Sequence, residues 1–195
     1  MALNLEKGQK ISLSKEAGGT LSKVTMGLGW DAVKKGGMLG GLFGSSGGSI
    51  DLDASCVLFD AHNKIIDTVW FRQLKSKDGS IVHTGDNLTG EGDGDDEQIN
   101  VDLSRVPESV KALVFTVNSF TGQTFDSIES AYCRMVDSSN NKEIARYTLS
   151  GKGGHSAQIM AKLYRHNDEW KMHAIGENGF GRTIESLLPE IIKHL

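Results

Sequence analysis

The segment AYCRMVDSSNNKEIARYTL (residues 131–149) contains two short apolar runs, 131–137 and 143–149, on either side of the pair Asn140-Asn141. Short runs with β-branched and aromatic residues are typical of β-strands, and asparagine is typical of the turns between them. The segment therefore predicts two strands separated by a turn.

The same pattern repeats along most of the chain. Turn-forming pairs at Asn63-Lys64, Asp78-Gly79 and Asn167-Asp168 separate further runs of strand length. These runs cover residues 10–15, 20–30, 52–60, 66–74, 98–103, 112–120, 158–166 and 170–177. Many short strands with turns between them are typical of a sandwich or barrel. We predict an all-β fold, a β-sandwich of two mainly antiparallel sheets.

Few segments predict helices. Residues 104–112 place a proline in an early turn, and residues 125–131 fit a short helix or a turn. Residues 182–195 predict a C-terminal amphipathic helix that packs on the sandwich, with Thr183 as its candidate cap. An oligomer contact is the alternative role for this helix. Its apolar residues at helical spacing are Ile184, Leu187, Leu188, Ile191, Ile192 and Leu195.

The size and composition are those of one soluble domain spanning 1–195. Cys56 and Cys133 each lie inside an apolar run, which favours two buried, reduced thiols over a disulfide. The first residues do not resemble a signal peptide, and no run approaches the roughly 18 apolar residues that span a membrane. We therefore expect a cytoplasmic protein.

The segment KKGGMLGGLFGSSGGSI (34–50) is rich in glycine, which makes one fixed conformation costly. It predicts a mobile loop within the domain. The segment also carries Met38, Leu39, Leu42 and Phe43, which a plain spacer does not need. We expect 36–48 to contact a partner protein or, peripherally, a membrane surface.

Acidic residues are concentrated in HTGDNLTGEGDGDDEQ (83–98), with five acids between Glu91 and Glu97. Like charges at this density repel one another, so an isolated acidic loop is costly unless solvent or a cation compensates it. Residues 86–102 contain seven Asp or Glu and no Lys or Arg, which argues against nucleic acid at this face.

Calcium needs six to eight oxygen ligands in a flexible cage, and this segment offers carboxylates, an amide and carbonyls. Interleaved glycines allow the chain to curl around an ion. Asp31, Asp51, Asp53 and Asp78 would join if their strand ends lie beside the segment. The oxygen-bearing side chains within it are Asp86, Asn87, Thr89, Glu91, Asp93, Asp95, Asp96 and Glu97.

Other interpretations of the acidic segment fit less well. An EF-hand would need glycine where Asp96 stands and helices where the flanks predict strands. Magnesium prefers fewer protein ligands, and zinc would find only His83 as a nearby nitrogen donor. A solvated acidic loop without metal is the remaining alternative.

Five motifs together resemble the TerD-type family of tellurium-resistance proteins over almost the whole chain. They are GLGWD, DLDAS, DGSIVHTGDNLTGEGDGDDE, ARYTLS and LYRHNDEWKMHAIGENGFG. The VWFRQLKS and TVNSFTGQTF segments and the glycine-rich insertion look most like the TerZ branch.

The resemblance implies a β-sandwich that binds Ca²⁺, with two ions, and a bacterial stress-response role tied to tellurite resistance. Its partners would be other stress-response or tellurium-resistance proteins. Carried over residue by residue, the implied ligand candidates are Asp31, Asp53, Asp78, Asp86, Asn87, Glu91, Asp93, Asp95, Asp96 and Glu97.

Catalytic motifs such as a nucleophile elbow, a P-loop or HExxH are missing from the sequence, so we predict a binding protein rather than an enzyme. It would act as an interaction or sensor module. The alternative is a metal-dependent phosphoesterase with His83 as general base, or an accessory subunit of a membrane-associated stress complex. A third interpretation is a scaffold with permanent ions.

Overall fold

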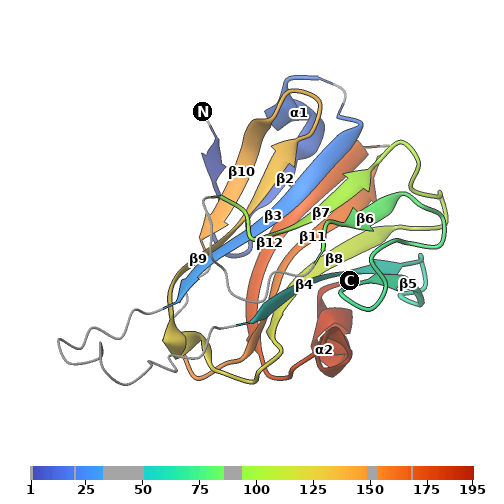
Figure 1. Ribbon diagram of the computed structural model, residues 1–195. Helices are drawn as coiled ribbons and strands as arrows, with labels where there is room; N and C mark the ends of the chain where they lie inside the picture. Colours follow the sequence, from blue (N-terminus) through green and yellow to red (C-terminus); the bar gives the residue numbers. More distant parts are fainter. Residues whose placement is uncertain (1, 20, 33–50, 86–93, 149–152, 168) are drawn as a thin grey trace, which may run out of the picture.

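Two six-stranded sheets pack face to face in the computed structural model (Figure 1), which describes residues 2–19, 21–32, 51–85, 94–148, 153–167 and 169–195. Sheet A has the order β1-β10-β9-β3-β7-β6 and sheet B the order β2-β12-β11-β8-β4-β5. Among the described strands, every pairing within the sheets is antiparallel except that of β1 with β10. The predicted β-sandwich is confirmed.

The strands have the following bounds. Sheet A contains β1 (Leu3–Asn4), β10 (Lys142–Thr148), β9 (Ile128–Asp137), β3 (Lys23–Ala32), β7 (Glu97–Asp102) and β6 (Ile81–His83). Sheet B contains β2 (Lys10–Ser12), β12 (Glu169–Gly179), β11 (Ala157–His166), β8 (Ala112–Ser119), β4 (Leu52–Phe59) and β5 (Ile65–Val69).

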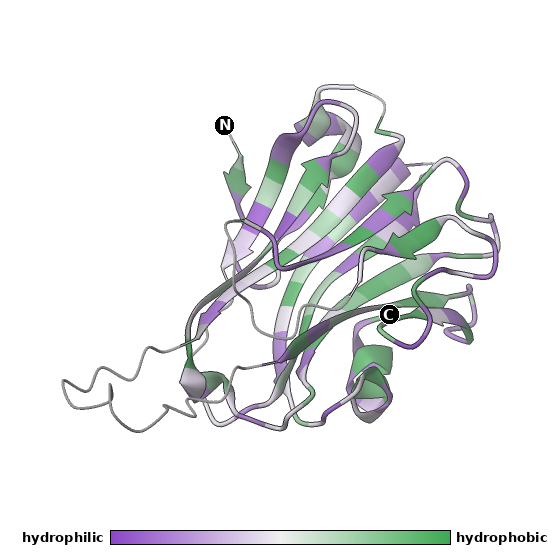
Figure 2. Cartoon of the chain, viewed as in Figure 1, coloured by the Kyte–Doolittle hydropathy of each residue, from purple (hydrophilic) through white to green (hydrophobic). Residues whose placement is uncertain are grey.

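Alternation of side chains explains why these strands form a sandwich. In β7, every second residue from Glu97 to Val101 is buried, while the residues between them are partly exposed. The buried faces of both sheets meet in one apolar cluster that includes Met26, Phe115 and Leu163. Figure 2 shows the resulting bands of hydrophobic and hydrophilic residues along the strands.

The predicted turns are confirmed by their backbone geometry. Asn63, Asn141 and Asn167 have φ values of 60°, 57° and 50°, and Gly79 has a φ of 76°. Asparagine and glycine tolerate this left-handed region better than other residues. The turns therefore set where each of these strands ends.

The C-terminal helix covers the outer face of sheet B, as predicted. Helix α2 (Ile184–Ile191), followed by the 3-10 turn η2 (Ile192–His194), buries Ile184, Leu187 and Ile191 in a second apolar cluster. Thr183 occupies the N-cap position with extended dihedral angles, although its side chain makes no capping hydrogen bond. Within the described residues, no helix has the length and apolar content to cross a bilayer.

Several sequence predictions were wrong in detail. The run 10–15 is not one strand, because Ser12 ends β2 and caps helix α1 (Leu13–Ala17), which stops at Gly18 with φ 79°. The run 66–74 ends as a strand at Val69, since Trp70 and Gln73 bond to each other in a tight turn. Strands β1 and β6 are too short for periodicity to predict.

The predicted helix at 104–112 does not form. Residues 104–111, all described, form turns and irregular backbone before β8 begins at Ala112, and the Arg165 side chain donates to the carbonyls of Val106 at 2.8 Å and Val110 at 3.2 Å. A side chain from β11 thus satisfies backbone carbonyls that a helix would bond internally. Residues 125–131 divide into the 3-10 helix η1 (Phe125–Ser127) and the start of β9.

Basic groups form a row on the outer face of sheet B. Strand register places His173 opposite both Lys10 and Lys162. Partial burial, together with the charges of Lys10, Lys162 and His194, lowers the pKa of His173 to about 4. His173 is therefore neutral in the folded protein at neutral pH.

We expect Leu187→Ala to lower the free energy of unfolding by about 2–5 kcal/mol, because it removes a fully buried anchor of α2. Ile192→Ala removes a half-exposed side chain and should change stability by less than about 0.5 kcal/mol. Urea unfolding measures both. Equal effects would contradict the packing of α2.

We expect His173→Gln to reduce the decrease in the free energy of unfolding as the pH falls. Because the folded pKa lies below the unfolded value, the unfolded chain takes up the proton first. The stability that His173 contributes above pH 6.5 is lost as the pH falls towards 4. Urea unfolding at pH 7 and pH 4.5 tests this, with exposed His62→Gln as the control. Identical pH dependence in both variants would contradict it.

Candidate metal centre

Acidic residues from three strands approach one another at one end of the sandwich. Strand β3 runs antiparallel to β7, with Leu28 opposite Glu97, so the end of β3 lies beside the residues that enter β7. Asp31 is near the end of β3, and Asp96 directly precedes β7. This arrangement brings Asp31, Asp96 and Glu97 to the same end of sheet A.

Asp96 is held by the backbone of β3. Its amide donates to the Leu28 carbonyl at 2.8 Å, and its Oδ2 accepts the Trp30 amide at 2.8 Å. Burial raises the pKa of Asp96, and the charges of Asp31, Asp95 and Glu97 raise it further, against the effect of the Trp30 hydrogen bond. Like charges are therefore close enough here to oppose ionisation.

Glu97 connects the two sheets. Its side chain is fully buried, and Oε2 accepts the amide of Ala54 in β4 at 2.7 Å. Ala54 follows Asp53, so this bond brings the start of β4 to the acids of sheet A. Asp51 and Asp53 are also buried, at 9% and 5% exposure. The second sheet therefore adds carboxylates to this end of the sandwich.

His83 lies inside the sandwich beside Glu97. Its Nε2 is 3.4 Å from Glu97 Oε2, which is close enough for an ion pair but not aligned as a hydrogen bond. Its Nδ1 accepts the Gly85 amide at 3.1 Å, which leaves the ring proton of a neutral imidazole on Nε2. Both side chains are fully buried, so His83 faces Glu97 rather than solvent.

The Asp95 carboxylate lies on the outer face of sheet A, above Gly27. Its carboxylate accepts Arg134 Nε at 2.7 Å and Arg134 Nη2 at 3.1 Å. Its side chain is 1% exposed in this ion pair. Asp95, one of the predicted ligands, is therefore already paired with a positively charged side chain, that of Arg134.

The structure does not bring Asp78 to this centre. Asp78 Oδ1 accepts the Ser80 amide at 2.7 Å, and the Ser80 carbonyl accepts the amide of Asp102, the last residue of β7. Asp78 thus lies at the far end of β7 from Glu97. Asp31 is exposed and accepts Ser130 Oγ at 2.6 Å.

The other predicted ligands, Asp86, Asn87, Glu91 and Asp93, lie outside the described residues, as does the glycine-rich segment 34–50. Within the part of the chain that is described, no three His, Cys, Asp or Glu side chains are placed to hold a metal by themselves. The described acids alone therefore do not form a metal site.

Comparison with known proteins is decisive for the family. A family model described as the TerD domain matches residues 1–190. The chain belongs to the TerD family. Tellurium resistance protein TerZ from Serratia marcescens is 54% identical to this chain, over 97% of this chain and 97% of its own length. Stress response protein SCP2 from Bacillus subtilis (strain 168) is 42% identical over 98% of this chain and 100% of its own length.

A solved structure agrees on the fold of the TerD domain. The crystal structure of a homologue of telluride resistance protein (TerD) from Streptomyces coelicolor A3(2) has a TM-score of 0.72. The two chains are 19% identical, and the match covers 89% of this chain and 98% of that one. At this identity the likeness establishes the shared fold alone.

Sequence reasoning missed the residues of this TerD domain that hold the acids in place. Arg134 binds Asp95, and the hydroxyl of Tyr132 donates to the Gly94 carbonyl at 2.7 Å. The available signals were the alternation of Tyr132 and Arg134 along one strand and the glycines of GLGWD. Neither signal names its partner without the strand register.

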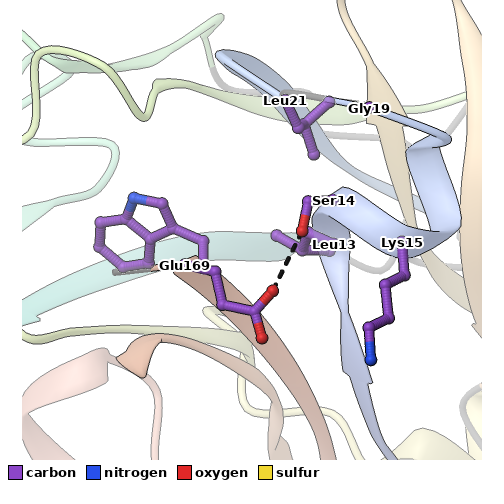
Figure 3. A pocket seen from close by; sticks show the side chains of 7 residues that line it. Leu13, Ser14, Lys15, Gly19, Leu21 and Glu169 are labelled. Atoms are coloured by element: carbon purple, nitrogen blue, oxygen red, sulfur yellow. Dashed lines mark hydrogen bonds between the residues drawn. The ribbon is translucent and has the colours of Figure 1, made fainter. Parts of the chain in front are cut away.

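A cavity among the described residues lies elsewhere. It has a volume of about 500 Å³ and is formed by α1, the segment before β3 and the start of β12 (Figure 3). At its rim, Glu169 accepts Ser12 Oγ at 2.7 Å and Ser14 Oγ at 3.1 Å. The metal candidates lie at the opposite end of β3, so this cavity is not part of their centre.

Both cysteines are buried, as predicted, and neither forms a disulfide. Burial raises the pKa of Cys133 to about 12 and that of Cys56 further. A thiolate is the reactive form, so neither thiol suits redox chemistry in the folded protein.

His155 is also buried, against the ring of Phe125, and burial lowers its pKa.

We expect both thiols to be inert to a disulfide reagent in the native protein at pH 7 and to react together in denaturant. Ellman titration measures this directly. The rate of unfolding is measured with urea pulses. A thiol that is labelled in the native protein faster than the protein unfolds would contradict the burial of the cysteines.

Proposed function

We propose that this TerD-family protein is a calcium-binding interaction or sensor module of the bacterial tellurium-resistance and stress response. Membership of that family is established above. The calcium site is supported by one observation: carboxylates of β3, β4 and β7 gather at one end of the sandwich, where burial and the neighbouring acids raise the pKa of Asp96.

The donor chemistry fits a hard cation. Asp31, Asp53, Asp96 and Glu97 supply carboxylate oxygens from both sheets, and the His83 imidazole beside them is turned to Glu97. Because they are too few alone, we propose that Asp86, Asn87, Glu91 and Asp93 add the remaining oxygens. Calcium, with its large and flexible oxygen shell, suits this set better than magnesium or zinc.

A bound ion would supply positive charge where the chain has concentrated negative charge. Two calcium ions would neutralise the acids and hold the ends of β3, β4 and β7 in one arrangement. A partner that recognises this arrangement would then bind in a calcium-dependent way. We propose stress-response or tellurium-resistance proteins as partners, with 36–48 as a further contact and the cytoplasm as the location.

The phosphoesterase alternative finds less support. A general base must come within hydrogen-bond reach of the substrate or its water. The His83 side chain is fully buried between the sheets and does not meet this requirement in the described structure. We retain the proposal of a binding protein and not of an enzyme.

Saturating calcium should raise the melting temperature of metal-free protein by about 5–10 °C, since a ligand at a hundred times its Kd adds about 2.7 kcal/mol. Asp96→Asn and Asp53→Asn should lose most of this rise, because each removes an oxygen charge from the centre. Calorimetry with the chelator-treated protein gives the affinity and stoichiometry.

Asp78→Asn is the matched control, because it removes the same charge at the far end of β7 and should keep the calcium response. An unchanged melting temperature in wild-type protein from micromolar to millimolar calcium would rule out the proposal. Equal loss in all three variants would mean that net charge, rather than this centre, attracts the ion.

A further inference from the structure

The carboxylate of Asp95 lies in a cradle built on the outer face of sheet A. Strand register places Gly27 of β3 between Gln98 of β7 and Arg134 of β9. Both flanking side chains bind Asp95: Gln98 Nε2 donates to Oδ2 at 3.1 Å, and Arg134 donates to both oxygens. Asp95 occupies the space above Gly27, where a Cβ atom would overlap its carboxylate.

A second set of contacts stiffens the cradle. Tyr132 crosses over Gly29, where a Cβ would overlap its ring, and its hydroxyl donates to the Gly94 carbonyl. Arg146 stacks on the Tyr132 ring at 4.1 Å. Glu143 accepts hydrogen bonds from both Arg146 and Arg134, so the two arginines share one counter-ion.

The cradle fixes the chain directly before the candidate metal centre. Asp95 is followed by Asp96 and Glu97, and the next amide, that of Asp96, bonds to Leu28. The Asp95 side chain points to Arg134, whereas Glu97 points between the sheets to Ala54. The chain therefore enters β7 held on one face by Arg134 and in the interior by Ala54.

We propose that Asp95 is an anchor rather than a calcium ligand, and that Arg134, Tyr132 and Gly27 are positioning residues for the proposed calcium site. The inference rests on the proposed function, because one of its two measurements is calcium binding. It assigns a task to glycines in mid-strand, where a residue with no side chain weakens a sheet unless another group must approach.

For the substitution Arg134→Met, positioning and simple electrostatics predict opposite changes in calcium affinity. By charge alone, Arg134→Met removes a cation near the site and frees a carboxylate, so calcium should bind more tightly. If Arg134 positions the acids, the same change should weaken calcium binding by about 10- to 100-fold, as loss of outer-shell support typically does.

Two further variants separate geometry from charge. Arg134→Lys keeps the charge but loses the two-pronged contact with Asp95, so it should also weaken binding. Gly27→Ala changes no charge and should act like Arg134→Met, because its methyl group displaces Asp95. Gly19→Ala is the matched control, since a Cβ there meets nothing within 4 Å and its effect on calcium should be small.

Calcium affinity is measured by calorimetry at a temperature where all variants are folded, with Leu187→Ala as a variant that loses stability far from the cradle. Amide exchange of Asp96 in chelator is measured in parallel. We expect weaker calcium binding and faster exchange in Arg134→Met, Arg134→Lys and Gly27→Ala, and wild-type values for both in Leu187→Ala and Gly19→Ala.

Tighter or unchanged calcium binding in Arg134→Met and Gly27→Ala would overturn the inference and return Asp95 to the ligands. If wild-type protein binds no calcium, the proposed function fails, and the exchange data then decide the anchor alone. Protection of the Asp96 amide that is unchanged in all three variants would show that the cradle does not position this segment.

Discussion

The hydrogen bond from the Ala54 amide to the Glu97 carboxylate sets how the two sheets meet at the acidic end of the sandwich. A buried carboxylate is costly unless a donor satisfies it, and Ala54 lies in β4 before that strand begins to pair with β5 at Cys56. The edge of β4 that is not yet paired with β5 thus offers an amide that Glu97 reaches from the other sheet. Because Asp53 directly precedes Ala54, the same contact determines which carboxylates of sheet B lie near those of sheet A.

The neighbouring acids are stabilised in different ways. Asp95 has a protein cation: its hydrogen bonds raise the pKa of Arg134, and Arg134 in turn shares Glu143 with Arg146. Asp96 accepts a backbone amide, but burial and the surrounding acids still raise its pKa. One carboxylate is therefore matched within the protein, while its neighbour is held in an environment that favours added positive charge. That contrast separates the proposed anchor, Asp95, from the candidate ligand, Asp96, at two consecutive residues.

The sequence predicted the strands whose signals are local. Alternation located β7 and β12, and left-handed asparagines marked the turns at Asn63 and Asn141. Signals that depend on a distant partner were missed. The turns at 104–112 are supported by Arg165 of β11, and the edge strands β1 and β6 are defined only by their neighbours. At the candidate site, acidic residue types were evident, but the sequence did not show that strand register places Asp78 at the far end of β7 or that Asp95 pairs with Arg134.

Strand register also explains why the site and the stability of the fold are coupled. The carboxylates are positioned by β3, β4 and β7, and the same strands enclose the apolar cluster that contains Met26, Leu52 and Ile99. Repulsion among the acids of these strands therefore acts on the packing of the two sheets. A cation that relieved this repulsion would stabilise the end of the sandwich. Binding of a partner there would be coupled to the packing of the core through the same strands.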